Sequence, residues 1–113
     1  MRVLVCGGRK YYNLPYITKV LEPYTNKDDT VIIHGGAAGA DWCAELIARR
    51  TNTPVLVFKA DWEWHGKAAG PIRNKAMLEE GKPDLVIAFS GGRGTANMVK
   101  QAKAKGVEVI ENV

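Results

Sequence analysis

The chain has 113 residues, of which 46% are apolar and 25% are charged. This length fits one domain with a single modest core, and the composition is ordinary for a globular protein. No apolar stretch approaches the roughly 20 residues that a membrane helix needs, and the apolar part of the N-terminus is too short for a signal peptide. We therefore expect one domain over residues 1–113, located in the cytoplasm and not in a membrane.

The formal net charge of +4 favours anionic partners such as nucleotides, phosphates or nucleic acid, without choosing among them. The two cysteines, Cys6 and Cys43, have no metal-ligand spacing. In a cytoplasmic chain we expect both to be buried, reduced thiols.

Five short apolar runs predict strands, and the segments between them have helical spacing. The strands are expected at residues 2–6, 30–34, 54–59, 84–89 and 107–111. The middle three are almost continuously apolar, which is typical of strands covered on both faces. The helices are expected at residues 14–24, 40–51, 71–81 and 95–106.

This regular alternation predicts an α/β fold, with a five-stranded parallel sheet, right-handed crossovers and helices on both faces. Residues 60–69, ADWEWHGKAA, are expected to form the one long connection. Connections of this length in a compact domain are often functional.

Glycine-rich turns follow three of the first four strands and should share one rim of the sheet, where α/β folds bind ligands. A glycine turn that feeds a helix presents free N–H groups to phosphate, and arginines add bidentate contacts. Glycine also occurs in such turns for steric reasons alone, and a single Gly-Gly pair does not separate the two. The candidate ligand-binding residues are Gly7, Gly8, Arg9, Gly35, Gly36, Arg73, Asn74, Gly91, Gly92, Arg93, Gly94 and Thr95.

Two standard nucleotide motifs are missing from the sequence. The first turn, GGRKYY, is not a G-x-G-x-x-G, and the second strand ends in His34 rather than in an acid. There is also no G-x-x-x-x-G-K-[ST]. The pattern therefore disfavours an ordinary NAD oxidoreductase and a P-loop NTPase.

Four stretches, taken in order, cover nearly the whole sequence: VLVCGGRKYY, IIHGGAAGADWCAELIA, KADWEWHGKAAGPIRNKAM and DLVIAFSGGRGTANMVKQAKAKGVEV. Together they resemble the YspA/YpsA-related (YAcAr-like) branch of the SLOG superfamily, which is named after the Smf/DprA proteins and the LOG enzymes. The resemblance implies a Rossmann-like sheet whose glycine loops bind nucleotides or nucleotide-derived ligands. No cofactor is expected.

LOG enzymes release the base from nucleoside 5′-monophosphates, and their signature is an arginine with a methionine four residues on, then P-G-G-x-G-T-x-x-E. Arg73 and Met77 match the first element, and residues 91–95 match the second. Ser90 replaces the proline, and Met98 stands where the family has its catalytic glutamate.

The missing acid matters because breaking a ribosyl C–N bond builds positive charge that a carboxylate can stabilise. LOG-type hydrolysis is therefore disfavoured. If catalysis occurs, the resemblance points to Arg73, and Asp41 is the first candidate for a replacement acid. The alternative for Asp41 is capping its helix or complementing the helix dipole.

The aromatic segment at 60–69 contains Trp62 and Trp64, which are candidates for stacking on a base. They could equally anchor the segment or form part of a subunit interface. The nearby alternation of Asp61, Glu63 and His65 is weak evidence for a metal, and none is expected.

The function expected first is binding of a nucleotide or nucleotide-derived phosphorylated ligand, as a sensor or carrier. The alternative is a hydrolase that cleaves an N-glycosidic or phosphoester bond in such a ligand. A second alternative is DprA-like binding of single-stranded nucleic acid, to which a compact phosphate cradle is less suited. The resemblance to LOG proteins also implies a homodimer that pairs through helices next to the site.

Overall fold

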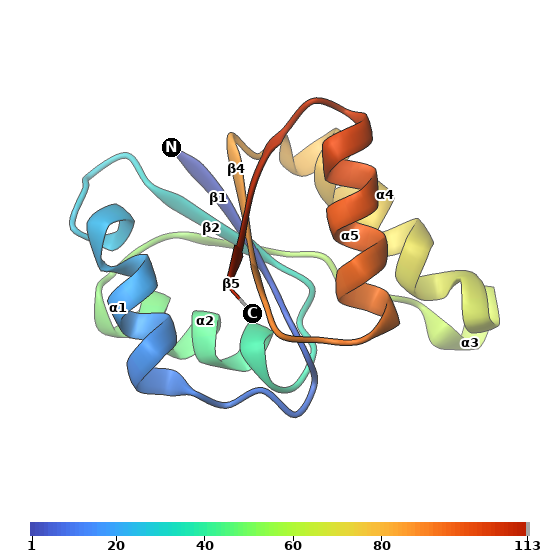
Figure 1. Cartoon of the computed structure of the whole chain (residues 1–113), viewed down its shortest axis with the longest axis horizontal. Helices are drawn as coiled ribbons and strands as arrows, with labels where there is room; N and C mark the ends of the chain where they lie inside the picture. The colour runs from blue at the N-terminus through green and yellow to red at the C-terminus, as the bar shows by residue number, and fades with distance from the viewer. Residues whose placement is uncertain (113) are drawn as a thin grey trace.

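The computed structural model describes residues 1–112, in which one parallel sheet lies between two layers of helices (Figure 1). The strands are β1 (Arg2–Cys6), β2 (Val31–His34), β3 (Val55–Val57), β4 (Leu85–Phe89) and β5 (Glu108–Asn112). The helices are α1 (Leu14–Thr25), α2 (Ala40–Arg50), α3 (Trp62–His65), α4 (Ala69–Gly81) and α5 (Arg93–Ala104), with a 3-10 turn η1 (Gly66–Ala68). The predicted α/β class with a five-stranded parallel sheet is confirmed.

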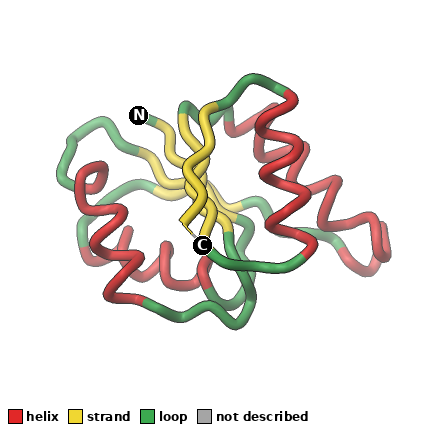
Figure 2. The backbone as a smooth tube through the Cα atoms, in the orientation of Figure 1, coloured by secondary structure: helices red, strands yellow, loops and turns green. Residues whose placement is uncertain are grey.

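The two faces of the sheet carry separate apolar clusters, because successive side chains of a strand point to opposite faces. Val3 and Val5 of β1 pack with residues of α1 and α2, whereas Leu4 and Cys6 pack with residues of α4 and α5. Figure 2 shows the strands in the middle, with helices on both sides. The expectation of helices on both faces is therefore confirmed.

The strand order is β3-β2-β1-β4-β5, so the chain runs outward from β1 to β3 and then crosses to the other side of β1. All neighbouring strands are parallel, and Cys6 of β1 lies opposite Ala88 of β4. The direction of winding reverses between β1 and β4, which is the position where open α/β sheets bind their ligands.

The expectation that the third strand is covered on both faces is wrong. β3 has only three residues and lies at the edge of the sheet, where Leu56 is 37% exposed and Val57 is 44% exposed. An apolar run alone does not distinguish an edge strand from a central one.

The expectation of one long loop at 60–69 is also wrong, since α3 and η1 occupy most of it. Asp61 begins α3, because its side chain accepts a hydrogen bond from the N–H of Trp64 at 3.1 Å. Helices α4 and α5 each begin two residues earlier than predicted, at Ala69 and Arg93. Among residues 1–112, no helix has the length and apolar character to cross a membrane.

Candidate functional site

A cavity of about 910 Å³ opens at the carboxyl ends of β1 and β4. This volume lies within the usual range for small-molecule sites. The turn after β1 and the turn after β4 form one wall, and α3, η1 and α4 supply much of the rest. Of the candidate residues, those that line the cavity are Gly7, Gly8, Arg9, Asp41, Trp62, Arg73, Asn74, Gly91, Gly92, Arg93, Gly94 and Thr95.

Some of the glycines are needed for the turns to pack against one another. The N–H of Gly8 donates to the carbonyl of Ser90 at 2.9 Å, and the N–H of Ala40 donates to the carbonyl of Gly8 at 3.1 Å. A Cβ on Gly7 would lie 2.6 Å from the Cβ of Ala40, and one on Gly91 would lie 2.7 Å from the nitrogen of Gly8. The steric explanation is therefore sufficient for Gly7, Gly8 and Gly91.

Gly92 and Gly94 have no such steric constraint. Both line the cavity, and a Cβ on either would meet nothing within 4 Å. Gly92 is the N-cap of α5 and provides no side-chain cap. No residue in the described part of the chain accepts a hydrogen bond from the N–H groups of Arg93, Gly94 or Thr95. These free donors at the positive end of a helix favour an anion.

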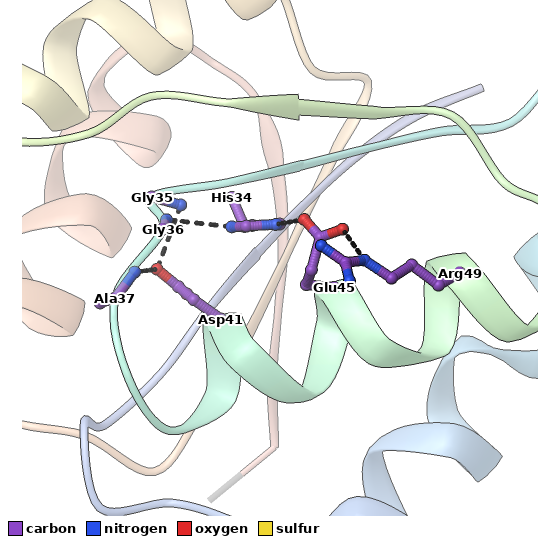
Figure 3. A network of polar contacts seen from close by, with 7 residues as sticks. All are labelled: His34, Gly35, Gly36, Ala37, Asp41, Glu45 and Arg49. Carbon is purple, nitrogen blue, oxygen red and sulfur yellow. Dashed lines mark hydrogen bonds and ion pairs between the residues drawn. The ribbon is translucent and has the colours of Figure 1, made fainter.

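The second glycine turn is not free to bind phosphate. The N–H groups of Gly35 and Ala37 donate to Oδ2 of Asp41 at 3.1 and 3.2 Å, and the N–H of Gly36 donates to Nδ1 of His34 at 3.0 Å (Figure 3). Gly35 and Gly36 also lie outside the cavity wall. The expectation that these two glycines bind the ligand does not fit the structure, because their donors are already used.

His34 holds this second turn in place through a fixed tautomer. The ring is 3% exposed. Because Nδ1 accepts from Gly36, the ring proton is on Nε2, which lies 2.8 Å from Oε1 of Glu45. Arg49 donates to the other oxygen of Glu45 at 2.9 Å. The hydrogen bond from His34 is the main reason that the pKa of Glu45 is lowered.

Asp41 lines the cavity and is not the N-cap of α2, but it lies in the first turn of that helix, where a carboxylate complements the helix dipole. The N-cap of α2 is Gly39, whereas the Asp41 carboxylate ties down the turn before it. The residue is 6% exposed, and burial raises the pKa of its carboxyl group above the usual value. It is the one carboxylate of the cavity wall within residues 1–112.

Arg73 and Asn74 are fixed by hydrogen bonds within the chain. Arg73 donates from Nη1 to the carbonyl of Gly35 at 2.8 Å and from Nε to Oδ1 of Asn74 at 3.0 Å. Asn74 is 3% exposed, and its Nδ2 donates to the carbonyl of Gly94 at 3.2 Å and to Oδ1 of Asn97 at 3.1 Å. Asn74 was predicted to bind the ligand, whereas in the structure its amide oxygen accepts from Arg73 and its NH₂ group joins α4 to α5.

Positive charge is concentrated at the cavity. Its wall contains five of the sixteen Lys and Arg residues of the chain. It contains one of the twelve Asp and Glu residues. The remaining eleven of each sign cancel, so the cavity residues account for the entire formal net charge of +4. The five cations are Arg9, Lys10, Lys67, Arg73 and Arg93.

Only one of the two candidate tryptophans lies at the cavity. Trp62 lines it, and the guanidinium carbon of Arg9 lies 5.2 Å from the centre of the Trp62 ring. Trp64, on the short helix α3, is 80% exposed and does not line the cavity. Tyr11 also lines the cavity and stacks on Phe89 with ring centres 5.6 Å apart.

Met98 lies in the core, not at the cavity. It is fully buried in the apolar cluster between the sheet and helices α4 and α5. The preceding residue, Asn97, is the one from this part of α5 that lines the cavity. Asn97 was not among the residues predicted from the sequence, although its spacing of three from Gly94 places both on one face of a helix.

The comparisons with known proteins identify the family of the chain. A family model described as "YspA, cpYpsA-related SLOG family" matches residues 1–65, which is more than half of the chain. The gene 61 protein of Mycobacterium phage D29 is 36% identical over 118 residues, which cover 96% of this chain and 94% of that protein. The chain belongs to the YspA, cpYpsA-related SLOG family.

A solved structure shows the fold expected of this SLOG family member. The X-ray structure of TM1055, Northeast Structural Genomics Consortium target VT76, superposes with a TM-score of 0.70 and 18% identity. The match covers 96% of this chain and 71% of that one. At this identity the likeness concerns the fold alone, and it confirms the Rossmann-like architecture.

Proposed function

We propose that this SLOG protein binds a nucleotide, or a phosphorylated ligand derived from one, in the cavity between β1 and β4. The observation that carries the proposal is the N-terminus of α5, whose free N–H groups line a cavity with five cations and one carboxylate. A phosphate group satisfies both the free donors and the excess positive charge.

The rest of the cavity suits the nucleoside part of such a ligand. Trp62 and Tyr11 provide aromatic surface in the wall, on which a base can stack. The wall offers a single carboxylate, and Oδ2 of this Asp41 already accepts two backbone N–H groups. We therefore propose binding without turnover as the principal activity.

Calorimetry with AMP and adenosine tests the proposal, because the pair differs only in the phosphate. AMP should bind at least tenfold more tightly, since charge-assisted hydrogen bonds contribute about 1.5–3 kcal/mol each. Equal affinities for the two compounds would refute the proposal.

A matched pair of arginine variants distinguishes the effect of a cation in the cavity wall from the effect of the overall charge of the protein. Arg9→Ala removes a cation from the cavity wall, whereas Arg50→Ala removes one from an exposed position at the end of α2. Both variants lose one positive charge, but only Arg9→Ala should weaken AMP binding by about tenfold. Equal losses in the two variants would show that the cavity is not the binding site.

A further inference from the structure

Asn97 presents an amide whose orientation is dictated by its neighbours. Its Oδ1 accepts two hydrogen bonds, from Nδ2 of Asn74 at 3.1 Å and from Nε2 of Gln101 at 2.7 Å. The amide orientation of Asn74 and that of Gln101 are each determined by a further neighbour that can only donate or can only accept a hydrogen bond. The oxygen and nitrogen of Asn97 can therefore be assigned from the hydrogen-bond network.

The first fixed reference is Arg73. A guanidinium can only donate, so the atom of Asn74 that meets Nε of Arg73 at 3.0 Å must be the amide oxygen. The NH₂ group of Asn74 is then the atom that meets the carbonyl of Gly94 and the side chain of Asn97. The atom of Asn97 that accepts this hydrogen bond must therefore be its amide oxygen.

The second fixed reference is the carbonyl of Pro71. A carbonyl can only accept, so the atom of Gln101 that lies 3.1 Å from it must be the NH₂ group. The same NH₂ group donates to Asn97 at 2.7 Å. Two independent chains of hydrogen bonds thus require the same orientation of the Asn97 amide. In the flipped orientation, the NH₂ group of Asn97 would face the NH₂ groups of Asn74 and Gln101, and neither of these could donate to it.

The remaining atom, Nδ2 of Asn97, has no hydrogen-bond partner among residues 1–112, and Asn97 lines the cavity. Side chains of a helix point toward its N-terminus, so this amide lies over the turn that contains Arg93 and Gly94. The free NH₂ group of Asn97 and the free backbone donors of α5 therefore belong to residues that line the same cavity.

We infer that Asn97 binds the ligand through its NH₂ group and selects an oxygen acceptor next to the phosphate held at α5. This inference rests on the proposed function and names a further determinant of that site. A fixed donor excludes a cation or another group that can only donate at this position. The oxygens that a phosphorylated nucleoside offers there are those of the phosphate and of the ribose.

Asn97→Asp tests the inference with a change of one atom. The aspartate keeps an oxygen for Asn74 and Gln101, but it replaces the NH₂ group in the cavity by a negatively charged oxygen. AMP affinity, measured by calorimetry, should fall by about tenfold or more, while the melting temperature stays near that of the wild type. Asn97→Ala, which also loses the two accepted bonds, should lower the melting temperature and weaken AMP binding less than Asn97→Asp does.

The opposite pattern would overturn the inference. If Asn97 only joined α5 to α4, Asn97→Ala would lower the melting temperature but bind AMP as the wild type does, and the loss in Asn97→Asp would come from charge repulsion alone. If the wild type itself did not bind AMP, the proposed function would fail and the inference with it. Repeating the alanine comparison with inorganic phosphate identifies the acceptor: a loss with both probes indicates a phosphate oxygen, and a loss with AMP alone indicates a ribose oxygen.

Discussion

Replacing Gly94 by leucine should make the protein more stable and unable to bind its ligand. Gly94 lies in the first turn of α5 and lines the cavity, and nothing in the protein lies within 4 Å of the place where a Cβ would be. A Cβ at this position therefore meets no group of the protein, and we expect the leucine side chain to occupy space at the cavity.

The two effects have magnitudes that can be worked out separately. Leucine is favoured over glycine in a helix by about 0.5–1 kcal/mol, which corresponds to a rise in melting temperature of roughly 2–5 °C for a domain of this size. The side chain also covers the backbone donors at the start of α5. Losing two charge-assisted hydrogen bonds costs about 3 kcal/mol, or roughly a hundredfold in affinity.

Thermal melting and calorimetry with AMP measure the two quantities on the same sample. Ala104→Leu is the matched control, because it adds a leucine at the exposed end of the same helix, outside the cavity. This control should bind AMP as the wild type does. A Gly94→Leu protein that melts at the expected temperature and still binds AMP normally would refute the placement of the ligand.

Three further results are expected. Because burial raises the pKa of Asp41 above the usual 3.8, the folded state holds a proton that the unfolded state releases, and stability falls as pH rises through this window. In urea denaturation, Asp41→Asn should therefore gain stability relative to the wild type as the pH rises above about 4; a difference that is constant with pH would contradict this. Sedimentation equilibrium at micromolar concentration should show a dimer, and Ile72→Lys, at a 44% exposed position of α4, should give a monomer; a wild type that is only monomeric would refute self-association. Chromatography should detect little or no base released from AMP, GMP, CMP or UMP, because the absence of a preorganised charge costs roughly a hundredfold to a thousandfold in rate; rapid release would show that the cavity supplies the missing acid.

The sequence was sufficient for the fold and for locating most of the residues that line the cavity. Alternating apolar runs and helical segments gave the five strands, and glycine turns after β1 and β4 marked the cavity wall. It could not show which strands lie at the edges, because the order of strands in a sheet depends on how the crossovers pack. The third strand was therefore expected to be covered on both faces, although Leu56 and Val57 of β3 are exposed.

The roles of individual glycines and polar residues needed the three-dimensional contacts. Gly36 and Gly92 belong to similar glycine-rich turns, but the N–H of Gly36 is bound by His34, whereas α5 begins at Gly92 with free donors. Likewise, the motif indicated that Met98 takes the place of the catalytic glutamate. In the structure Met98 is buried in the core, and the neighbouring residue Asn97 lines the cavity.

The most direct test of the account is a titration of the ¹⁵N-labelled protein with AMP, followed by the chemical shifts of its backbone amides. The protein has a mass of 12.4 kDa, which is well suited to this measurement. The account predicts that the largest shifts occur at the amides of Arg93, Gly94 and Thr95, whose N–H groups are free in the structure. Largest shifts at Gly35 and Gly36 instead, with the start of α5 unaffected, would contradict it.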